Sequence, residues 1–249
     1  MVAVYTQIET DIPKDNAFYG FISRTHFLFS VSYSVICSKK WFDKIILFVD
    51  KKSYNNMIPV LDLFDEVVII DIPYKYGKTW AIGKINTYSV IDTPFVHIDF
   101  DAYLLTPYIK IFAERGIIIH QKELSDIHLS AYMKQFECIK GYNNSMLSYF
   151  NTDIIKQYCS YACGVLGTYN YKLINTIYLE VIEFVRSNNI NEDLSLSLEQ
   201  GYLSMYLQGN NFEVYEALTQ HKTLSEQLKE MKRKGYIHLV GNLKKKDKG

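Results

Sequence analysis

The sequence predicts an α/β fold in which a mainly parallel central sheet is flanked by helices. Residues 44–50 (KIILFVD) and 66–73 (EVVIIDIP) are short runs that are apolar on both faces. Such runs are typical of central parallel strands that helices cover on both sides. Segments with helical spacing of apolar residues occur between runs of this kind. This alternation of strand and helix is typical of α/β proteins.

The other elements follow from the same two periodicities. Further strands are expected at residues 2–8, 94–105, 116–122 and 164–168. Helices are expected at residues 18–38, 79–92 (with Thr79 as N-cap), 171–186 and 194–207, with a short basic helix around 224–231. No linker divides the chain, so we expect one domain over residues 1–249.

Composition excludes some classes of partner. Lys+Arg and Asp+Glu both number 27, so the formal net charge is zero, which argues against nucleic-acid binding driven by net charge. No run of 18 apolar residues predicts a transmembrane helix, and the first residues do not resemble a signal peptide. The four cysteines form no CxxC pair, as expected for free thiols in a reducing compartment. We therefore expect a cytoplasmic protein.

The sharpest local feature is residues 97–101 (HIDFD), at the end of an expected strand. If the strand is continuous, His97, Asp99 and Asp101 share one face. Two adjacent carboxylates resist ionisation unless a cation lies between them, and Mg²⁺ or Mn²⁺ takes ligands of this kind. Open α/β sheets bind ligands at this edge. The alternatives are acids that merely end a strand in solvent, or a haloacid-dehalogenase-type phosphatase, which usually has Thr where this chain has Tyr103.

Three other motifs accompany residues 99–101 (DFD). Residues 83–84 (GK) lie on the preceding expected helix, residues 199–200 (EQ) lie on a later one, and residues 238–244 (HLVGNLK) read HxxGxxK. In type and order, this set resembles glycosyltransferase family 8. That family has the GT-A fold and includes glycogenin and the lipopolysaccharide galactosyltransferases. HxxGxxK behind an upstream DxD is more specific than either motif alone.

The resemblance implies a single GT-A-type, Rossmann-like domain that transfers a sugar from a nucleotide-sugar donor, a UDP-sugar, with retention of configuration. It also implies Mn²⁺ or Mg²⁺ as cofactor. The positions that match the family's motifs have these implied roles: metal binding by Asp99, Asp101 and His238; donor binding by Lys84, Asp99, Gly241 and Lys244; and catalysis by Glu199 and Gln200.

The implied chemistry suits these residue types. A divalent metal would neutralise the diphosphate as its bond to the sugar breaks, and a neutral imidazole suits Mn²⁺ better than Mg²⁺. Lys244 would add positive charge at the terminal phosphate, and Lys84 would do so from the other side or contact the sugar. Glu199 and Gln200 project from the inward-facing stripe of their helix, where sugar hydroxyls, or a hydrogen bond within the core, would serve as partners.

Two departures from the family keep other functions open. Residues 162–164 (ACG) stand where the family has Asn-Ala-Gly or Asn-Ser-Gly, and residues 245–246 (KK) replace its Pro-Trp. A non-catalytic sugar-nucleotide-binding protein is one alternative. A nucleotidyltransferase is another, although residues 6–9 (TQIE) lack its Gly-rich basic loop. If the enzyme inverts instead, Glu199 or Glu123 could act as the base.

From about residue 229 the chain is basic, and we expect this segment to close over the bound donor. A solvated tail and attraction to an anionic membrane surface at the inner membrane face are the alternatives. The acceptor is open: a glycan, a lipid, a peptide or a small molecule. His97, His120 and Cys163 are expected to be core residues.

Overall fold

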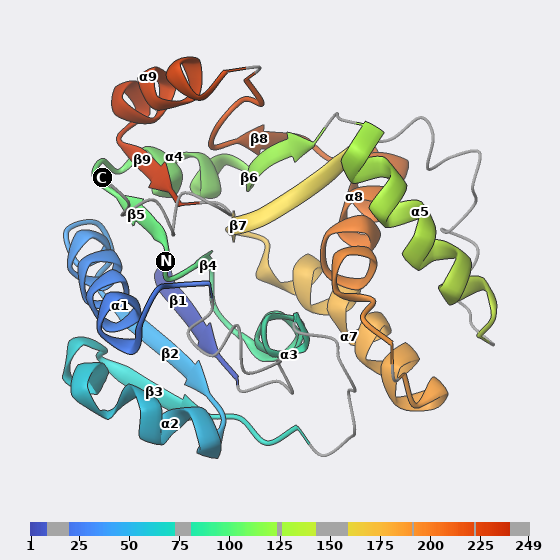
Figure 1. The fold of residues 1–249 in the computed structure, drawn as a ribbon, viewed down its shortest axis with the longest axis horizontal. Helices are drawn as coiled ribbons and strands as arrows, with labels where there is room; N and C mark the ends of the chain where they lie inside the picture. Colours follow the sequence, from blue (N-terminus) through green and yellow to red (C-terminus); the bar gives the residue numbers. More distant parts are fainter. Residues whose placement is uncertain are drawn as a thin grey trace.

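The computed structural model describes residues 1–8, 20–72, 81–123, 126–142, 159–190, 192–221 and 223–239. Its centre is a seven-stranded sheet of order β3-β2-β1-β4-β7-β6-β8, in which every strand except β7 runs in the same direction (Figure 1). This mainly parallel sheet confirms the predicted α/β class. The strands are β1 (Val2–Gln7), β2 (Ile45–Val49), β3 (Glu66–Ile69), β4 (Phe95–Ile98), β6 (Ile117–Glu123), β7 (Ser160–Thr168) and β8 (Val214–Glu216).

Helices cover both faces of the sheet. One face packs against α1 (Arg24–Ser38), η2 (Ile58–Leu63), which follows α2 (Lys51–Met57), and α4 (Tyr108–Arg115). The other packs against α3 (Ile82–Val90), α5 (Asp126–Lys140), α7 (Tyr171–Asn188), the π-helical segment η4 (Leu196–Gly201) and α8 (Tyr202–Gly209). Each strand therefore contributes side chains to two hydrophobic cores, which explains why β2 is buried at every position.

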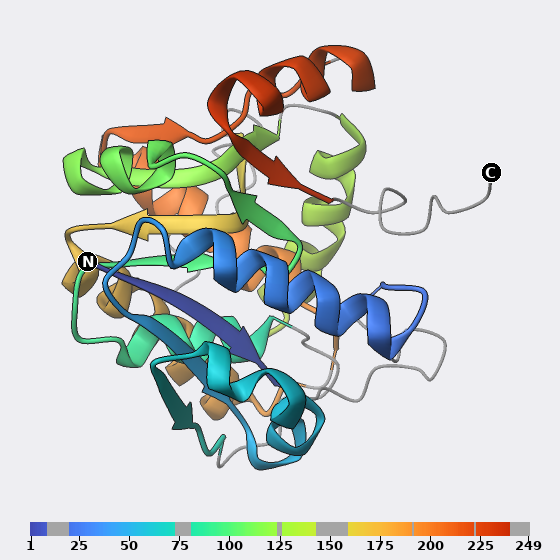
Figure 2. The same ribbon diagram turned by 90° about the vertical axis from the view of Figure 1, so that its left-hand side faces the viewer.

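A second, two-stranded sheet lies beside the first. β5 (Ala102–Leu104) pairs antiparallel with β9 (Tyr236–His238), and Figure 2 shows the two strands side by side. The helix α9 (Leu224–Lys234) immediately precedes β9 and is capped at its C-terminus by Gly235, whose positive φ of 62° suits glycine. This small sheet brings the end of the described chain to the segment that follows β4.

One predicted element is wrong in a way that matters for the site. Residues 94–105 do not form a continuous strand, because the chain turns at Asp99–Asp101 and the backbone N–H of Ala102 donates to the carbonyl of Asp99 at 2.9 Å. His97 and the two aspartates therefore do not share one strand face. The local periodicity did not reveal the turn, since apolar residues continue on both sides of it.

Other boundaries differ less. The helix expected at residues 18–38 begins at Arg24, where the side chain of Ser23 accepts from the backbone N–H of His26. The helix expected from residue 79 begins at Ile82, and Thr79 lies outside the described residues. The strand expected at 164–168 is longer and is antiparallel β7. The helices α2, α4 and α5 were not predicted.

Two expectations concerned membranes and thiols. Among the residues that the structure describes, no helix combines the length and the apolar composition needed to cross a bilayer. All four cysteines are free thiols, and Cys37 and Cys163 are buried.

Candidate active site

The predicted site lies at the carboxyl edge of the parallel strands. From β1 the chain first winds outward through β2 to β3 and then returns to the other side of β1 to form β4. The winding direction therefore reverses between β1 and β4. Open α/β sheets bind ligands at such a reversal, beyond the carboxyl ends of the strands. Asp99 follows the last residue of β4 directly.

The turn that carries the two aspartates is held from both sides. On β7, the carbonyl of Gly164 accepts from the backbone N–H of Asp99 at 3.0 Å. On α1, the hydroxyl of Ser30 donates to the carbonyl of Phe100 at 2.7 Å, and that of Ser34 donates to the carbonyl of Ala102 at 2.6 Å. Buried serines on α1 therefore satisfy backbone groups that the turn removes from the sheet.

The pairing of β5 with β9 brings His238 to Asp101. Ala102 is opposite His238, and the backbone N–H of Leu239 donates to the carbonyl of Asp101 at 2.9 Å. The imidazole Nε2 of His238 lies 3.2 Å from Oδ1 of Asp101. One ligand atom each from Asp99, Asp101 and His238 lies within 4.8 Å of the other two. The three residues predicted as metal ligands are thus brought together.

The bare backbone of β7 makes room for this imidazole. A Cβ atom on Gly164 would lie 2.1 Å from Cε1 of His238, far inside van der Waals contact. Only glycine allows the ring to pack here, so β7 fixes the ring against Asp101. Two carboxylates and one imidazole fit Mn²⁺ as a ligand set, since that ion accepts both oxygen and nitrogen donors.

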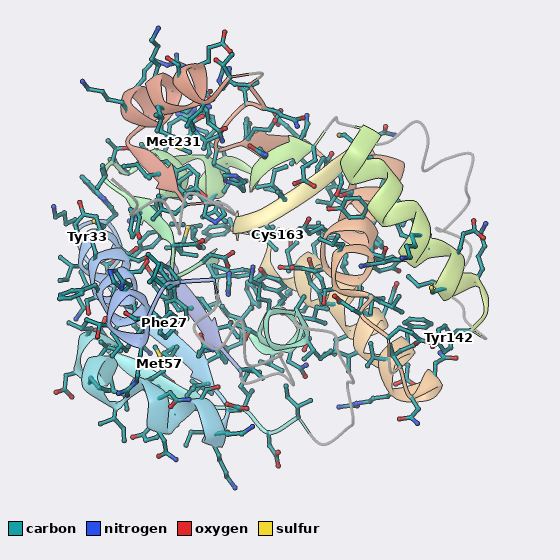
Figure 3. All side chains as sticks on the ribbon, in the orientation of Figure 1. Phe27, Tyr33, Met57, Tyr142, Cys163 and Met231 are labelled. Carbon is teal, nitrogen blue, oxygen red and sulfur yellow. The ribbon has the colours of Figure 1, made fainter. Side chains whose placement is uncertain are left out.

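The other side of Asp99 is a partly buried ion pair. The ammonium of Lys84 lies 2.7 Å from Oδ1 of Asp99 and 3.4 Å from Oε1 of Glu199. It also donates to the carbonyl of Cys163 at 3.4 Å; Figure 3 labels Cys163 on β7, near the middle of the molecule. Burial favours the neutral amine, but the two carboxylates outweigh it and raise the pKa of Lys84 above its usual value.

Gly83 explains how Lys84 reaches this position. A Cβ on Gly83 would lie 2.9 Å from the side chain of Ile8, so glycine lets α3 approach the end of β1 closely. The next residue, Lys84, then points across the sheet edge to Asp99. The two residues that the resemblance singled out as a pair therefore act together in positioning one ammonium group.

Glu199 is fully buried, and only one of its carboxylate oxygens has a partner. Tyr88 donates to Oε1 at 3.5 Å, whereas Oε2 has no hydrogen-bond partner among the described residues. Burial raises the pKa of Glu199 to about 7, although the positive charge of Lys84 opposes the shift. Glu199 lies in a π-helical turn. Such turns are rare in proteins overall, and many of those that occur lie at functional sites. An orphaned carboxylate oxygen beside a candidate metal ligand is suited to bind a polar substrate group.

Gln200 points elsewhere. It is only partly buried, and its Oε1 accepts from the hydroxyl of Tyr132 on α5 at 2.5 Å. The same hydroxyl lies 3.0 Å from Oε2 of Glu123. Gln200 and Glu123 are therefore connected through Tyr132.

The remaining predicted residues divide into two groups. His97, His120 and Cys163 are buried, as expected of core residues. However, His120 also contacts His238, a contact that the sequence did not indicate. Gly241 and Lys244 lie outside the described residues, so their predicted donor contacts stay predictions.

A cavity of about 360 Å³ lies at the opposite edge of the sheet. It is bordered by the end of α4, the start of β6 and the end of β7, and no predicted site residue lines it. The chemistry-bearing residues are therefore separate from this cavity.

The fold and the site together define an α/β protein with a candidate metal centre at the switch point of its sheet. The chain belongs to the family described as "Family of unknown function (DUF6734)", whose model matches residues 5–249. No curated protein matches the chain.

Several solved structures are similar to the chain. They include the galactosyltransferase LgtC in complex with donor and acceptor sugar analogs, at 12% identity over 88% of this chain and 73% of that chain, with a TM-score of 0.44. Mouse xyloside xylosyltransferase 1 in its apo form matches at 8% identity over 86% and 83%, with a TM-score of 0.44. The inositol-1-phosphate CTP transferase from T. maritima matches at 14% identity over 94% and 95%, with a TM-score of 0.45. At such identities and TM-scores the likeness carries no argument about activity.

Proposed function

We propose that this chain is a metal-dependent glycosyltransferase that takes a sugar from a nucleotide-sugar donor, a UDP-sugar, and passes it to an acceptor. The observation that carries the proposal is the cluster of Asp99, Asp101 and His238 at the switch point of the sheet, within 4.8 Å of one another. Mn²⁺ or Mg²⁺ bound there would compensate the charge of the leaving nucleoside diphosphate.

The chain's own residues would do the rest. Lys84 holds Asp99 in place and adds a fixed positive charge beside the diphosphate. Glu199 contributes the free oxygen Oε2, which can accept a hydrogen bond from a sugar hydroxyl. Gln200 is proposed to act from the same helical turn. Gly241 and Lys244 complete the proposal as donor contacts on a segment that folds over the diphosphate, within one catalytic domain.

Turnover without an acceptor tests the proposal, because water can replace the acceptor. With Mn²⁺ and a panel of UDP-, GDP-, CMP- and dTDP-sugars, we expect slow release of free nucleotide that EDTA abolishes. A parallel assay supplies a nucleoside triphosphate with a sugar phosphate and measures pyrophosphate. Release of pyrophosphate instead of free nucleotide would make the chain a nucleotidyltransferase. Tight binding with neither product would favour a non-catalytic binding protein.

A further inference from the structure

Two buried side chains continue the site behind His238. Nδ1 of His238 lies 3.4 Å from Nε2 of His120 on β6, and Nδ1 of His120 lies 2.9 Å from the hydroxyl of Tyr236. Tyr236 and His238 are two residues apart on β9 and so face the same side, toward His120. His120 and Tyr236 have exposed fractions of 1% and 0%. The groups form one chain of contacts: Asp101, His238, His120 and Tyr236.

The two imidazole rings must donate their hydrogen bonds in the same direction along this series of contacts. A neutral imidazole has one N–H and one lone pair, so a ring that donates through one nitrogen accepts at the other. The ring of His120 is buried between His238 and the hydroxyl of Tyr236, where a charged ring would be costly, so we take the ring as neutral. Fixing the proton on one ring therefore fixes the proton on the other.

Without a cation, Asp101 sets the direction. Its carboxylate oxygen lies 3.2 Å from Nε2 of His238, and two lone pairs at that distance would repel, so Nε2 carries the proton. The lone pair on Nδ1 then accepts from Nε2–H of His120, and Nδ1 of His120 accepts from the hydroxyl of Tyr236. All donors in this arrangement point toward Asp101.

Metal ligation requires the opposite direction. A ligating imidazole offers a lone pair to the ion, and its other nitrogen donates to an acceptor that fixes the ring. For His238 that lone pair is on Nε2, which faces the aspartates, and the acceptor is Nε2 of His120. The proton of His120 must then be on Nδ1, where the Tyr236 oxygen accepts it. The backbone at Gly164 packs against the His238 ring, so proton positions change rather than ring orientation.

We propose that His120 and Tyr236 are positioning residues for His238, and that the hydrogen-bond chain reverses direction when a divalent cation binds to Asp99, Asp101 and His238. On cation binding, His238 releases its Nε2 proton to solvent on the metal side and receives the Nε2 proton of His120 at Nδ1. His120 receives the hydroxyl proton of Tyr236 at Nδ1, and Tyr236 regains a proton from water, so one proton leaves at His238 and one enters at Tyr236. This inference rests on the metal site of the proposed function.

Nitrogen-15 NMR of histidine-labelled protein tests the reversal directly. Long-range ¹H–¹⁵N spectra distinguish the two neutral tautomers, and Zn²⁺ serves as a diamagnetic probe that binds imidazole and carboxylate ligands. In the metal-free protein we expect both His120 and His238 to carry the proton on Nε2. With Zn²⁺ both are expected to carry it on Nδ1, while His97 is unchanged. The variants His120→Gln and His97→Leu assign the signals.

Each other result is decisive. Zn²⁺ binding that Asp99→Ala abolishes, but with the tautomer of His120 unchanged, would overturn the reversal and leave the metal site standing. A metal-free His238 that already carries its proton on Nδ1 would also overturn the reversal. Absence of any Zn²⁺ effect on the histidine signals would overturn both the reversal and the metal site.

Affinity gives a second readout. His120→Leu removes the acceptor for His238 and is expected to weaken Zn²⁺ binding by about 10- to 100-fold. His120→Gln keeps a side-chain oxygen acceptor and should restore most of the affinity. His97→Leu, at another buried histidine whose Nδ1 has no partner among the described residues, is the matched control for loss of a buried ring. Equal affinity in His120→Leu and His97→Leu would contradict the positioning role.

Discussion

Asp99 separates two regions of opposite character. On one side, Asp101 and His238 present oxygen and nitrogen atoms that lie, together with one from Asp99, within 4.8 Å of one another. On the other, Lys84 already compensates Asp99 and Glu199 with its positive charge. The first region is therefore a candidate site for a cation from outside, whereas the second is stabilised by the ammonium group that the chain supplies itself.

The largest effect is expected from a variant that removes both carboxylates of the first region. In the double variant Asp99→Ala/Asp101→Ala, Mn²⁺-dependent stabilisation by UDP should disappear, with binding weakened by about 100-fold or more, because both carboxylate ligands are lost. Thermal shift with UDP, with and without Mn²⁺, measures this. Asp43→Ala/Asp62→Ala, at two exposed aspartates, is the matched control. A full wild-type shift in the Asp99/Asp101 variant would show that the metal is not bound here.

The second region can be broken at Lys84. Lys84→Met leaves the partly buried Asp99 and the fully buried Glu199 together without a positive charge, and removing the partner of the buried Glu199 carboxylate destabilises by about 3 kcal/mol. Lys140→Met removes an exposed pair with Glu137 and should change the free energy of unfolding by less than about 0.5 kcal/mol. Urea denaturation compares the two variants. Equal losses would mean that solvent screens the Lys84 pair as effectively as a surface pair.

The pH dependence of stability tests the protonation of Glu199 in the same region. The pKa of Glu199 is raised from 4.5 to about 7 in the folded protein, so between these values the folded state binds more protons than the unfolded state. The contribution of Glu199 to the free energy of unfolding therefore falls as pH rises, by about 2 kcal/mol between pH 5 and pH 7. Glu199→Gln does not titrate and should lack this fall. Parallel pH profiles of wild type and variant would refute the raised pKa.

The sequence predicted the members of both regions better than their connections. The DxD pattern correctly indicated that Asp99 and Asp101 lie together, but the reason given was wrong, since a turn and not a continuous strand places them. His238 was found through its motif spacing alone. The antiparallel pairing of β5 with β9, which brings it to Asp101, joins segments far apart in the chain and leaves no local periodicity.

Contacts between elements were the part that sequence could not predict. Helical spacing placed Glu199 on an inward-facing stripe, and the residue is fully buried. Its ion pair with Lys84 depends on how α3 packs against η4, and the π-helical turn departs from the 3.6-residue period on which the prediction relied. His120 was predicted as a core residue because a lone histidine in an apolar strand carries no signal of a second histidine behind it.

The smallest change in stability is expected from Gly164→Ala. This variant tests whether the position of the His238 ring is needed for cation binding in the first region. Gly164→Ala places a Cβ 2.1 Å from Cε1 of His238, a ring held between Asp101 and His120. The ring must shift, which should lower the free energy of unfolding by about 1–2 kcal/mol and weaken Mn²⁺ binding, because Nε2 no longer faces the aspartates. Gly209→Ala, where the new Cβ meets nothing within 4 Å, is the matched control and should leave both quantities nearly unchanged. Calorimetric titration with Mn²⁺ and urea denaturation separate the two effects. A variant that is destabilised but binds Mn²⁺ as wild type does would show that His238 is not a ligand, while the ion pair of Lys84 would remain as the feature that orders Asp99.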